Sequence, residues 1–338
     1  MTAGSYIVYG APHSLFTRKL ETALDFYGAD YRSVLKRGSG MESEIEARSG
    51  THQMPVLQTP ENWMIADTTP VIDLLDSRFP RRRLFPAGPQ GVVVHLVEEL
   101  FDEWISRVMV HYRWNYPENA ETVSRQMGHG DEKVTEYLRN WGPRACRATG
   151  TGTPELGEAA EAEYRRLLAA MESQLGETDY LLGDYPTAAD CAVLGGLYAH
   201  ILNDPEPLKM MEAFPRVVAW AEAQPGSDRG SCRAPGTREI VLTPFARLAL
   251  EILAEAYTPF VVGNGEALRE GRKAFIIDTY GIEASYLTRP YPEQSRALLR
   301  RRIQQGLEPA EREETLKLLE EFGLSDAFSP VPGESLPG

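Results

Sequence analysis

The chain has 338 residues, 42% hydrophobic and 25% charged, which is enough apolar material for two or three folded domains. Its 35 Lys and Arg residues against 49 Asp and Glu residues give a net charge of −14, which would repel phosphate backbones and anionic lipids. We therefore expect no nucleic acid and no membrane among its partners. Cys146, Cys191 and Cys232 form no CxxC pair, which argues against a disulfide framework, a zinc finger and a dithiol redox site.

The N-terminal stretch MTAGSYIVYG lacks the basic start and apolar core of a signal peptide. The apolar runs of the chain are much shorter than a membrane span. The sequence also has no HExxH motif and no carboxylate cluster, so we expect no metal site. A soluble, cytoplasmic protein is the expectation.

Residues 1–82 alternate between strand and helix patterns. The run YIVY, closed by Gly10, is typical of a short buried strand, and apolar residues from position 16 to 27 recur at helical spacing. Further strands are predicted at 31–35, 55–57 and 63–66, and a closing helix covers 71–75. The order βαβ, then ββα, predicts an α/β layer around a small mixed sheet.

Residues 91–225 have a helical pattern throughout. Apolar residues keep a 3–4 spacing from 93 to 112, which predicts one helix of about five turns, and similar patterns cover 164–175 and 191–201. Helices joined by short turns predict an all-α bundle. Stretches rich in Pro and Gly at 81–91 and 224–236 are the expected linkers.

Residues 237–338 form a third, mostly helical segment. We predict an amphipathic helix at 245–268, a two-stranded ribbon at 273–278 and 283–287, and helices at 293–305 and 309–322. The three arginines at 300–302 point in different directions on a helix, so they predict a solvated or salt-bridged face rather than a phosphate site.

Two motifs carry the most information. Pro55 follows an apolar residue at the head of a hairpin, which fits a cis peptide bond that exposes the backbone of Met54 to an extended ligand. Thr187 and Asp190 fit a capping box, in which the carboxylate returns to the backbone of the N-cap residue. The second motif indicates a buried helix start and therefore fold rather than catalysis.

The segments YGAPHSLFTRKLETAL, QMPVL and ADTTPVIDLLDSRFP, followed by YLLGDYPTAADCAVLGG and FPRVVAWAEA, together resemble the glutathione transferase family over roughly residues 5–225. The resemblance implies a thioredoxin-like α/β domain at 1–82 and an all-α domain at 91–225. A C-terminal extension of unknown role at 237–338 follows. The family resemblance also implies glutathione as co-substrate and a homodimer.

The resemblance places Ser14 where the family has its active-site Ser or Cys, so its hydroxyl could donate to the glutathione sulfur. The alternative is that Ser14 only caps the first helix. Thr17 and Tyr9 are further candidates for the hydroxyl donor. Because no cysteine stands at this position, transfer, addition or isomerisation is favoured over thiol–disulfide exchange.

The resemblance also implies the glutathione-binding residues. Asp67 and Thr68 align with the pair that holds the γ-glutamyl end, although Asp67 is one methylene shorter than the family's usual residue. Gln53, Met54 and Pro55 would complete the site, with the backbone of Met54 pairing to the cysteinyl unit. The glycyl carboxylate could be held by any of three nearby residues: Lys36, Arg37 or His52.

The helix around 104–114 is rich in aromatic and arginine side chains, which most often indicates core and otherwise an acceptor pocket. The function that we expect is addition or conjugation of the glutathione thiolate to a small electrophile. Two alternatives stay open. One is a non-catalytic scaffold or protein-interaction module on the same fold. The other is a glutathione-dependent lyase, dehalogenase or isomerase.

Overall fold

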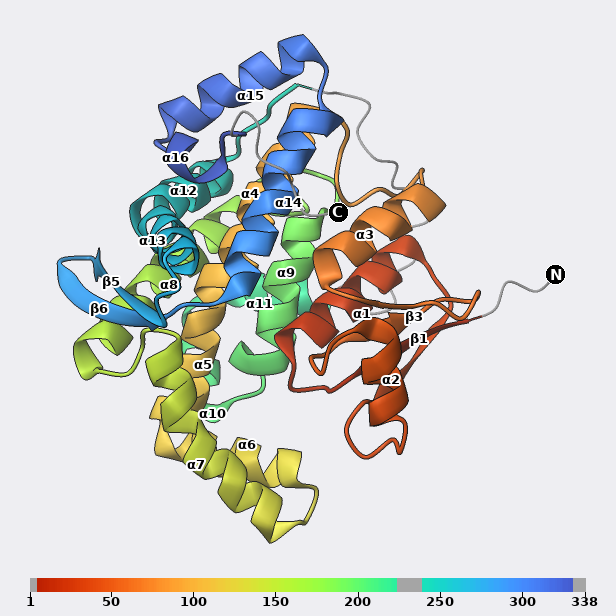
Figure 1. Cartoon of the computed structure of the whole chain (residues 1–338), viewed down its shortest axis with the longest axis vertical. Helices are drawn as coiled ribbons and strands as arrows, with labels where there is room; N and C mark the ends of the chain where they lie inside the picture. Colours follow the sequence, from red (N-terminus) through yellow and green to blue (C-terminus); the bar gives the residue numbers. More distant parts are fainter. Residues whose placement is uncertain (1–4, 224–238, 331–338) are drawn as a thin grey trace.

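The computed structural model describes residues 5–223 and 239–330. The predicted linker at 224–236 and Cys232 therefore lie outside the described residues. The N-terminal part alternates strands and helices, as the sequence predicted (Figure 1). Its elements are β1 (Tyr6–Gly10), α1 (Leu15–Tyr27), β2 (Tyr31–Leu35), α2 (Glu42–Ser49), β3 (Val56–Gln58), β4 (Met64–Ala66) and α3 (Thr68–Arg78).

The four strands form one mixed sheet in the order β2-β1-β3-β4. β1 runs parallel to β2 and antiparallel to β3, and β3 pairs antiparallel with β4 through the register Leu57↔Ile65. Val8 and Leu57 belong to the main core together with residues of α1 and α3, whereas Tyr9 and Val56 pack with Ile45 of α2 in a second, smaller cluster. The sheet is thus covered on both faces, which is the expected thioredoxin-like arrangement.

The middle part is helical. Its elements are α4 (Pro89–Glu99), η1 (Leu100–Ile105), α5 (Ser106–Asn115), α6 (Pro117–Gly128), α7 (Glu132–Ala148), α8 (Pro154–Gln174), α9 (Ala188–Gly196), η2 (Leu197–Ile201), α10 (Pro205–Met210), η3 (Met211–Ala213) and α11 (Pro215–Glu222). This confirms an α/β domain followed by an all-α domain. The helix predicted at 93–112 is correct in place but is interrupted, because residues 100–105 of η1 adopt a wider π-helical turn.

The C-terminal part contains further helices and one ribbon. Its elements are α12 (Pro244–Ile252), η4 (Leu253–Tyr257), α13 (Thr258–Arg269), β5 (Ala274–Thr279), β6 (Ile282–Leu287), α14 (Pro290–Gly306), α15 (Pro309–Glu321) and α16 (Ser325–Phe328). The antiparallel ribbon of β5 and β6 and the last two long helices confirm the sequence prediction. Of the three arginines, Arg302 forms a salt bridge with Asp73, as predicted, whereas Arg300 is buried rather than solvated and donates to the backbone carbonyl of Ala327.

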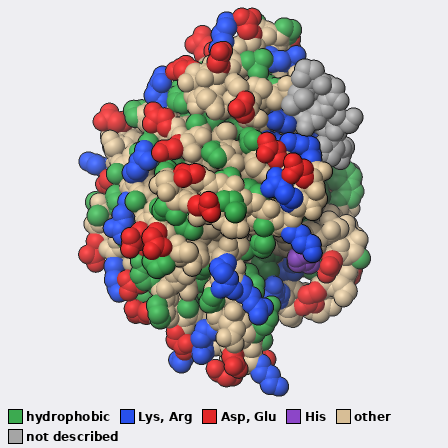
Figure 2. Space-filling model, turned by 60° about the vertical axis from the view of Figure 1, so that its left-hand side comes forward, with side chains coloured by type: hydrophobic (Ala, Val, Ile, Leu, Met, Phe, Trp, Pro, Cys, Tyr) green, Lys and Arg blue, Asp and Glu red, His purple; other side chains and the backbone are tan. Residues whose placement is uncertain are grey.

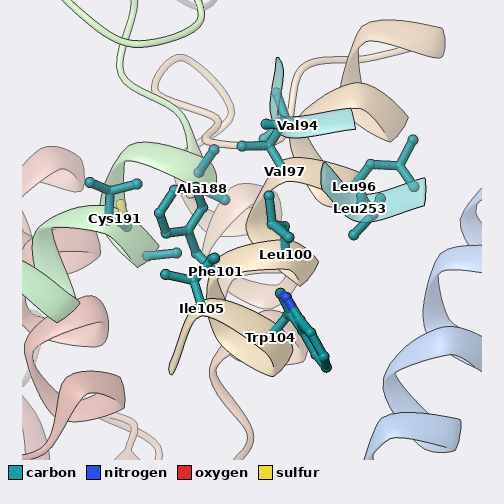
Figure 3. Packing of buried hydrophobic residues seen from close by; sticks show 14 of the residues in the cluster. Val94, Leu96, Val97, Leu100, Phe101, Trp104, Ile105, Ala188, Cys191 and Leu253 are labelled. Carbon is teal, nitrogen blue, oxygen red and sulfur yellow. The ribbon is translucent and has the colours of Figure 1, made fainter. Parts of the chain in front are cut away.

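The α/β and helical parts meet where α1 packs against α9. A Cβ atom at Gly195 would lie 2.7 Å from the backbone oxygen of Leu15, so only glycine allows this close approach. Figure 3 shows Ala188 and Cys191 of α9 beside Phe101, and Leu96 of α4 beside Leu253 of η4. Residues of all three parts belong to this one core cluster.

The surface carries both signs of charge. On the face shown in Figure 2, acidic and basic side chains are interspersed, with hydrophobic side chains between them. Among the described residues, no helix is long and apolar enough to cross a membrane. Nor do the described residues bring three or more His, Cys, Asp or Glu side chains together in a group that could hold a metal ion.

Candidate functional site

A pocket of about 820 Å³ lies where the three parts of the chain meet. One wall is the loop before β3 and the start of α3, the second is η1 with the start of α5, and the third is the start of α14. The lining residues are Phe16, Arg37, Gly50, Thr51, His52, Gln53, Met54, Pro55, Ala66, Asp67, Thr68, Asp102, Glu103, Ser106, Arg289, Pro290, Tyr291 and Gln294. All five residues predicted to bind glutathione are among them.

The loop before β3 presents backbone to this pocket. The Met54–Pro55 peptide bond is cis, as predicted, and Pro55 leads directly into β3. Gln53 is exposed and Met54 half-buried, whereas Pro55 is buried. The backbone of Met54 therefore lies beside open space, where an extended ligand could pair with it.

Asp67 and Thr68 lie at the start of α3. Asp67 is the N-cap residue and has a left-handed backbone with φ of 71°, and its carboxylate accepts a bond of 3.3 Å from the backbone N–H of Thr69. Thr68 is buried directly beside it. A helix start offers unpaired N–H groups and a positive dipole end, which suit a ligand carboxylate, while the Asp67 side chain suits an ammonium group.

The three hydroxyl candidates do not line the pocket. Ser14 caps α1 and its Oγ accepts from the backbone N–H of Thr17 at 3.3 Å, so the capping role is present. A hydroxyl that accepts one bond still has its proton to donate. Phe16, which is two residues further on, does reach the pocket. Ser14 is half-buried at the end of α1 that carries Phe16.

The other two hydroxyl candidates, unlike Ser14, belong to buried side chains that lie in contacts within the fold. Oγ1 of buried Thr17 accepts from the backbone N–H of Ala11 at 3.2 Å, and the same side chain packs against Gly10. The Tyr9 hydroxyl donates to Oε1 of Gln58 at 2.9 Å, and its ring belongs to the small cluster under the sheet. Ser14 therefore stays the first of the three candidates.

Two of the three predicted anchors for the glycyl carboxylate reach the pocket. Arg37 and His52 are both exposed and line it. Lys36 is buried, and its ammonium donates to the backbone carbonyls of Thr51 (3.2 Å) and Gln53. Burial also lowers the pKa of Lys36. Lys36 thus supports the loop before β3 from behind rather than facing a ligand.

The second wall is acidic. Asp102 and Glu103 of η1 line the pocket, and Asp102 is also paired with the fully buried ammonium of Lys19. Lys19 lies 2.5 Å from Oε1 of Glu98 as well. Burial alone would lower the pKa of Lys19, but the carboxylates of Asp102 and Glu98 outweigh it and raise that pKa. The network ties α1 to the π-helical turn and so fixes this wall.

Burial has the opposite effect on the acids of this wall. Desolvation raises the pKa of Asp102, and the Glu98 carboxylate adds to the rise while Lys19 opposes it. Desolvation and the nearby Glu99 carboxylate raise the pKa of Glu103. A ligand ammonium at this wall would offset the desolvation by stabilising the two carboxylates, so a cationic group is favoured there over an anionic one.

The aromatic and arginine-rich helix is core, in line with the more common of its two interpretations. Trp104 is 1% exposed and donates from Nε1 to Glu163 at 3.0 Å, and Arg107 donates to the same carboxylate at 2.8 Å. Arg113 is paired with Asp204 at 2.9 Å. The helix thus contributes the polar residues 102, 103 and 106 to the pocket instead of an aromatic face.

No pattern in the sequence predicts the third wall of the pocket. Arg289, Pro290, Tyr291 and Gln294 come from the start of α14, more than 180 residues after the acids that they face. Their types and spacing are ordinary for a helix start. Only the packing of the C-terminal part against the rest of the chain brings them to the pocket.

Two stretches of the chain match known domain families. Residues 8–83 match the glutathione S-transferase N-terminal domain, and residues 154–223 match the glutathione S-transferase C-terminal domain. The chain is a glutathione S-transferase family protein. The first match spans β1 to α3 with the loop of Pro55, and the second spans α8 to α11 with the capped start of α9. Residues 239–330 lie beyond both matches.

Individual relatives share only low sequence identity with this chain. A maleylacetoacetate isomerase of Pseudomonas aeruginosa is 23% identical over 197 residues, which are 57% of this chain and 80% of the isomerase. The solved structure of the beta-etherase LigF from Sphingobium sp. strain SYK-6 is 18% identical, with 66% of this chain and 96% of that chain covered and a TM-score of 0.48. A glutathione S-transferase from Rhodospirillum rubrum F11 is 17% identical, with 72% and 99% covered and a TM-score of 0.46.

Proposed function

We propose that the protein binds glutathione in this pocket and adds its thiolate to a small electrophile. The observation that carries the proposal is the convergence of the cis-Pro55 loop and the Asp67–Thr68 helix start on one pocket, in a chain with both glutathione S-transferase domains. An extended peptide edge beside a helix start suits a small peptide with a carboxylate and an ammonium at one end.

Each part of glutathione would have a partner in this arrangement. The backbone of Met54 would pair with the cysteinyl unit, and the α3 N-terminus with Thr68 would take the γ-glutamyl carboxylate. Asp67 would take the γ-glutamyl ammonium, and Gln53 on the loop before β3 would complete the site. Arg37 or His52 would hold the glycyl carboxylate, since both line the pocket.

The chemistry needs the thiolate, because the thiol is a poor nucleophile. A thiol with a pKa near ~8.5 must lose roughly two pKa units to be ionised at neutral pH, which is about 2.7 kcal/mol of preferential stabilisation of the anion. A hydrogen bond from Ser14 and the N-terminus of α1 could supply this amount. The thiol proton leaves to solvent. The thiolate then forms a carbon–sulfur bond, and either a leaving group departs or the adduct takes a proton from water.

A glutathione-dependent isomerase is the second candidate, and the maleylacetoacetate isomerase of Pseudomonas aeruginosa favours it. In that case the thiolate would add to the substrate reversibly and leave again after rearrangement, with no net consumption of glutathione. Loss of free thiol during turnover distinguishes the two, because only conjugation consumes glutathione.

Three further properties belong to the proposal. The chain would divide into a glutathione-binding domain at 1–82, an all-α domain at 91–225 and an extension at 237–338. The other two are a homodimer, which rests on the family alone, and a cytoplasmic location, which rests on the sequence expectation alone. Sedimentation of the purified chain tests the dimer.

The test of the mechanism is turnover of a panel of electrophiles by wild type and Ser14→Ala. Loss of one hydrogen bond to an anion predicts a fall in kcat/KM of about 10- to 100-fold near neutral pH, with a smaller deficit at higher pH where the thiol ionises unaided. Thr153→Ala is the matched control, because Thr153 caps α8 through the same kind of bond, 3.4 Å to the N–H of Leu156, away from the pocket.

If the two variants lose equal and small amounts of activity, Ser14 is a helix cap and the proposed role is wrong. If wild type turns over none of the electrophiles yet rearranges an unsaturated acid without loss of thiol, the isomerase is the better account.

A further inference from the structure

Ser14 ends the short turn, residues 11–14, that joins β1 to α1. The peptide unit between His13 and Ser14 is hydrogen-bonded on both sides. Its N–H, that of Ser14, donates to the carbonyl of Ala11 at 3.0 Å, and its carbonyl, that of His13, accepts from Nη1 of Arg113 at 2.8 Å. Because a peptide unit is planar, these two bonds fix the orientation of the backbone from which the Ser14 side chain leaves.

Arg113 lies in the last turn of α5, 100 positions from His13, and is 3% exposed. Its Nε and Nη2 atoms donate to the two carboxylate oxygens of Asp204 at 2.9 and 3.0 Å, and Nη2 donates also to the carbonyl of Ala199. Nη1 lies 3.3 Å from Nε2 of His200. Together with the bond to His13, each of the five N–H groups of the guanidinium has an acceptor, so the group is held in one orientation.

The acceptors around Arg113 are themselves fixed. Asp204 is fully buried, is the N-cap residue of α10 and accepts from the side chain of Asn203 at 2.9 Å. Burial, and after it the charge of Arg113, lowers the pKa of His200, so its ring is neutral and Nε2 can accept a hydrogen bond. The position of the guanidinium is therefore set by the all-α part of the chain.

The bond from Arg113 serves the turn rather than the interface between the two domains. The helix α1 already packs against α9, where Gly195 allows the backbone of Leu15 to approach closely. Among the described residues, Arg113 makes the hydrogen bond that joins residues 11–14 to the all-α part. Without it, this turn would be held by bonds to its own neighbours along the chain.

We propose that Arg113 is a positioning residue that acts through the backbone of His13 and aims the hydroxyl of Ser14 at the sulfur of bound glutathione. The inference rests on the proposed function. Oγ of Ser14 accepts from the N–H of Thr17 at 3.3 Å, so its proton remains for the thiolate, and the strength of that bond depends on where the backbone places Oγ. A displacement of about 1 Å at a reacting group costs up to roughly 100-fold in rate.

The test measures the ionisation of bound glutathione. The thiolate absorbs ultraviolet light that the thiol does not, so the absorbance of the complex gives the fraction of thiolate. We expect Arg113→Lys to leave about three- to tenfold less thiolate than wild type at neutral pH, with Ser14→Ala as the reference for full loss of the hydroxyl. Lysine keeps a positive charge for Asp204, but an ammonium lacks the planar fork that also reaches His13.

Two controls separate this role from a general structural one. Arg107→Lys changes another buried arginine of α5, which pairs with Glu163 at 2.8 Å and whose described hydrogen bonds do not reach residues 11–14. It should keep the wild-type fraction of thiolate. The second control is titration calorimetry with S-methylglutathione, which has no thiol to ionise and which Arg113→Lys should bind as wild type does. The stoichiometry of this titration counts the folded sites, so the thiolate is expressed per folded site even where part of a variant is unfolded.

A wild-type fraction of thiolate in Arg113→Lys, together with a loss in Ser14→Ala, would overturn this inference alone. A weaker affinity of Arg113→Lys for S-methylglutathione would also overturn it, because the pocket as a whole would then be disturbed. Absence of thiolate in the wild-type complex, or no effect of Ser14→Ala, would overturn the proposed role of Ser14 and this inference with it.

A double-mutant cycle tests whether Arg113 acts through Ser14. In the Ser14→Ala background we expect Arg113→Lys to have no further effect on the fraction of thiolate or on kcat/KM, because the hydroxyl that Arg113 positions is gone. Melting temperatures of all variants separate loss of fold from loss of thiolate. Additive losses in the cycle would contradict the positioning role.

Discussion

Glu99 is a buried acid that connects two distant parts of the chain. It lies at the end of α4, is 1% exposed, and accepts from Tyr257 and Ser295 of the C-terminal part. Burial raises the pKa of Glu99 to about 8, while the two hydroxyl donors oppose the rise. Glu99 is therefore protonated in the folded protein at neutral pH, although it would be ionised in the unfolded chain.

Glu99 should make the protein less stable as the pH rises. Its folded pKa lies above the unfolded value, so the folded state binds the extra proton between about pH 4.5 and 8, and across this window stability falls by at most about 1.4 kcal/mol per pH unit. Glu99→Gln should flatten this dependence in urea unfolding at several pH values. Glu313→Gln, at an exposed pair with Lys317, is the control. An unchanged slope in Glu99→Gln would contradict the assignment.

At the scale of single residues, the sequence predicted what depends on neighbours along the chain. Pro55 and the pair Thr187–Asp190 were identified because a cis-proline turn and a capping box are local arrangements. Lys19 was missed because an ammonium acquires its role only from its partners, and the two carboxylates that pair with it lie more than 75 residues further along the chain. Nothing in its local sequence separates Lys19 from a surface lysine.

At the scale of elements, the start of α9 is capped by a buried acid. Asp190 is fully buried and accepts from the N–H and Oγ1 of Thr187 at 2.8 and 2.7 Å and from the N–H of Leu181 at 3.0 Å. Because α9 packs against α1, this cap holds the interface between the two domains. Burial raises the pKa of Asp190 to about 6.

Asp190→Ala should therefore cost about 3 kcal/mol of unfolding free energy, since it leaves two buried N–H groups without an acceptor. Asp131→Ala is the matched comparison, because Asp131 caps α7 through bonds of 2.9 and 3.3 Å but is exposed, and should cost only about 1 kcal/mol. Urea unfolding measures both. Equal losses in the two variants would show that burial of the cap adds nothing.

The elements that the sequence predicted are those with a periodic apolar face. α2 was missed because Ile45 is its only buried residue among the described side chains, so no pattern shows. The interruption of the helix at residues 100–105 was also missed, because a π-helical turn adds one residue without breaking the apolar character. Apolar spacing records which face is buried and not how the backbone turns between buried residues.

At the scale of the whole molecule, the extension is part of the same core as the two domains. One cluster of buried side chains runs from Tyr6 to Phe328, and Glu99 and Arg302 add polar ties between α14 and α4 or α3. No pattern in the sequence indicates which surface the extension covers, since that depends on packing between distant segments. Its place at the pocket follows from the structure.

The central claim is that this pocket binds glutathione, and titration calorimetry of the purified wild-type chain tests it most directly. The account predicts one glutathione per chain with a dissociation constant between about 1 μM and a few mM, weakened in Asp67→Asn. If saturating glutathione gives no heat at two temperatures, the pocket is not a glutathione site, and the proposed chemistry is wrong.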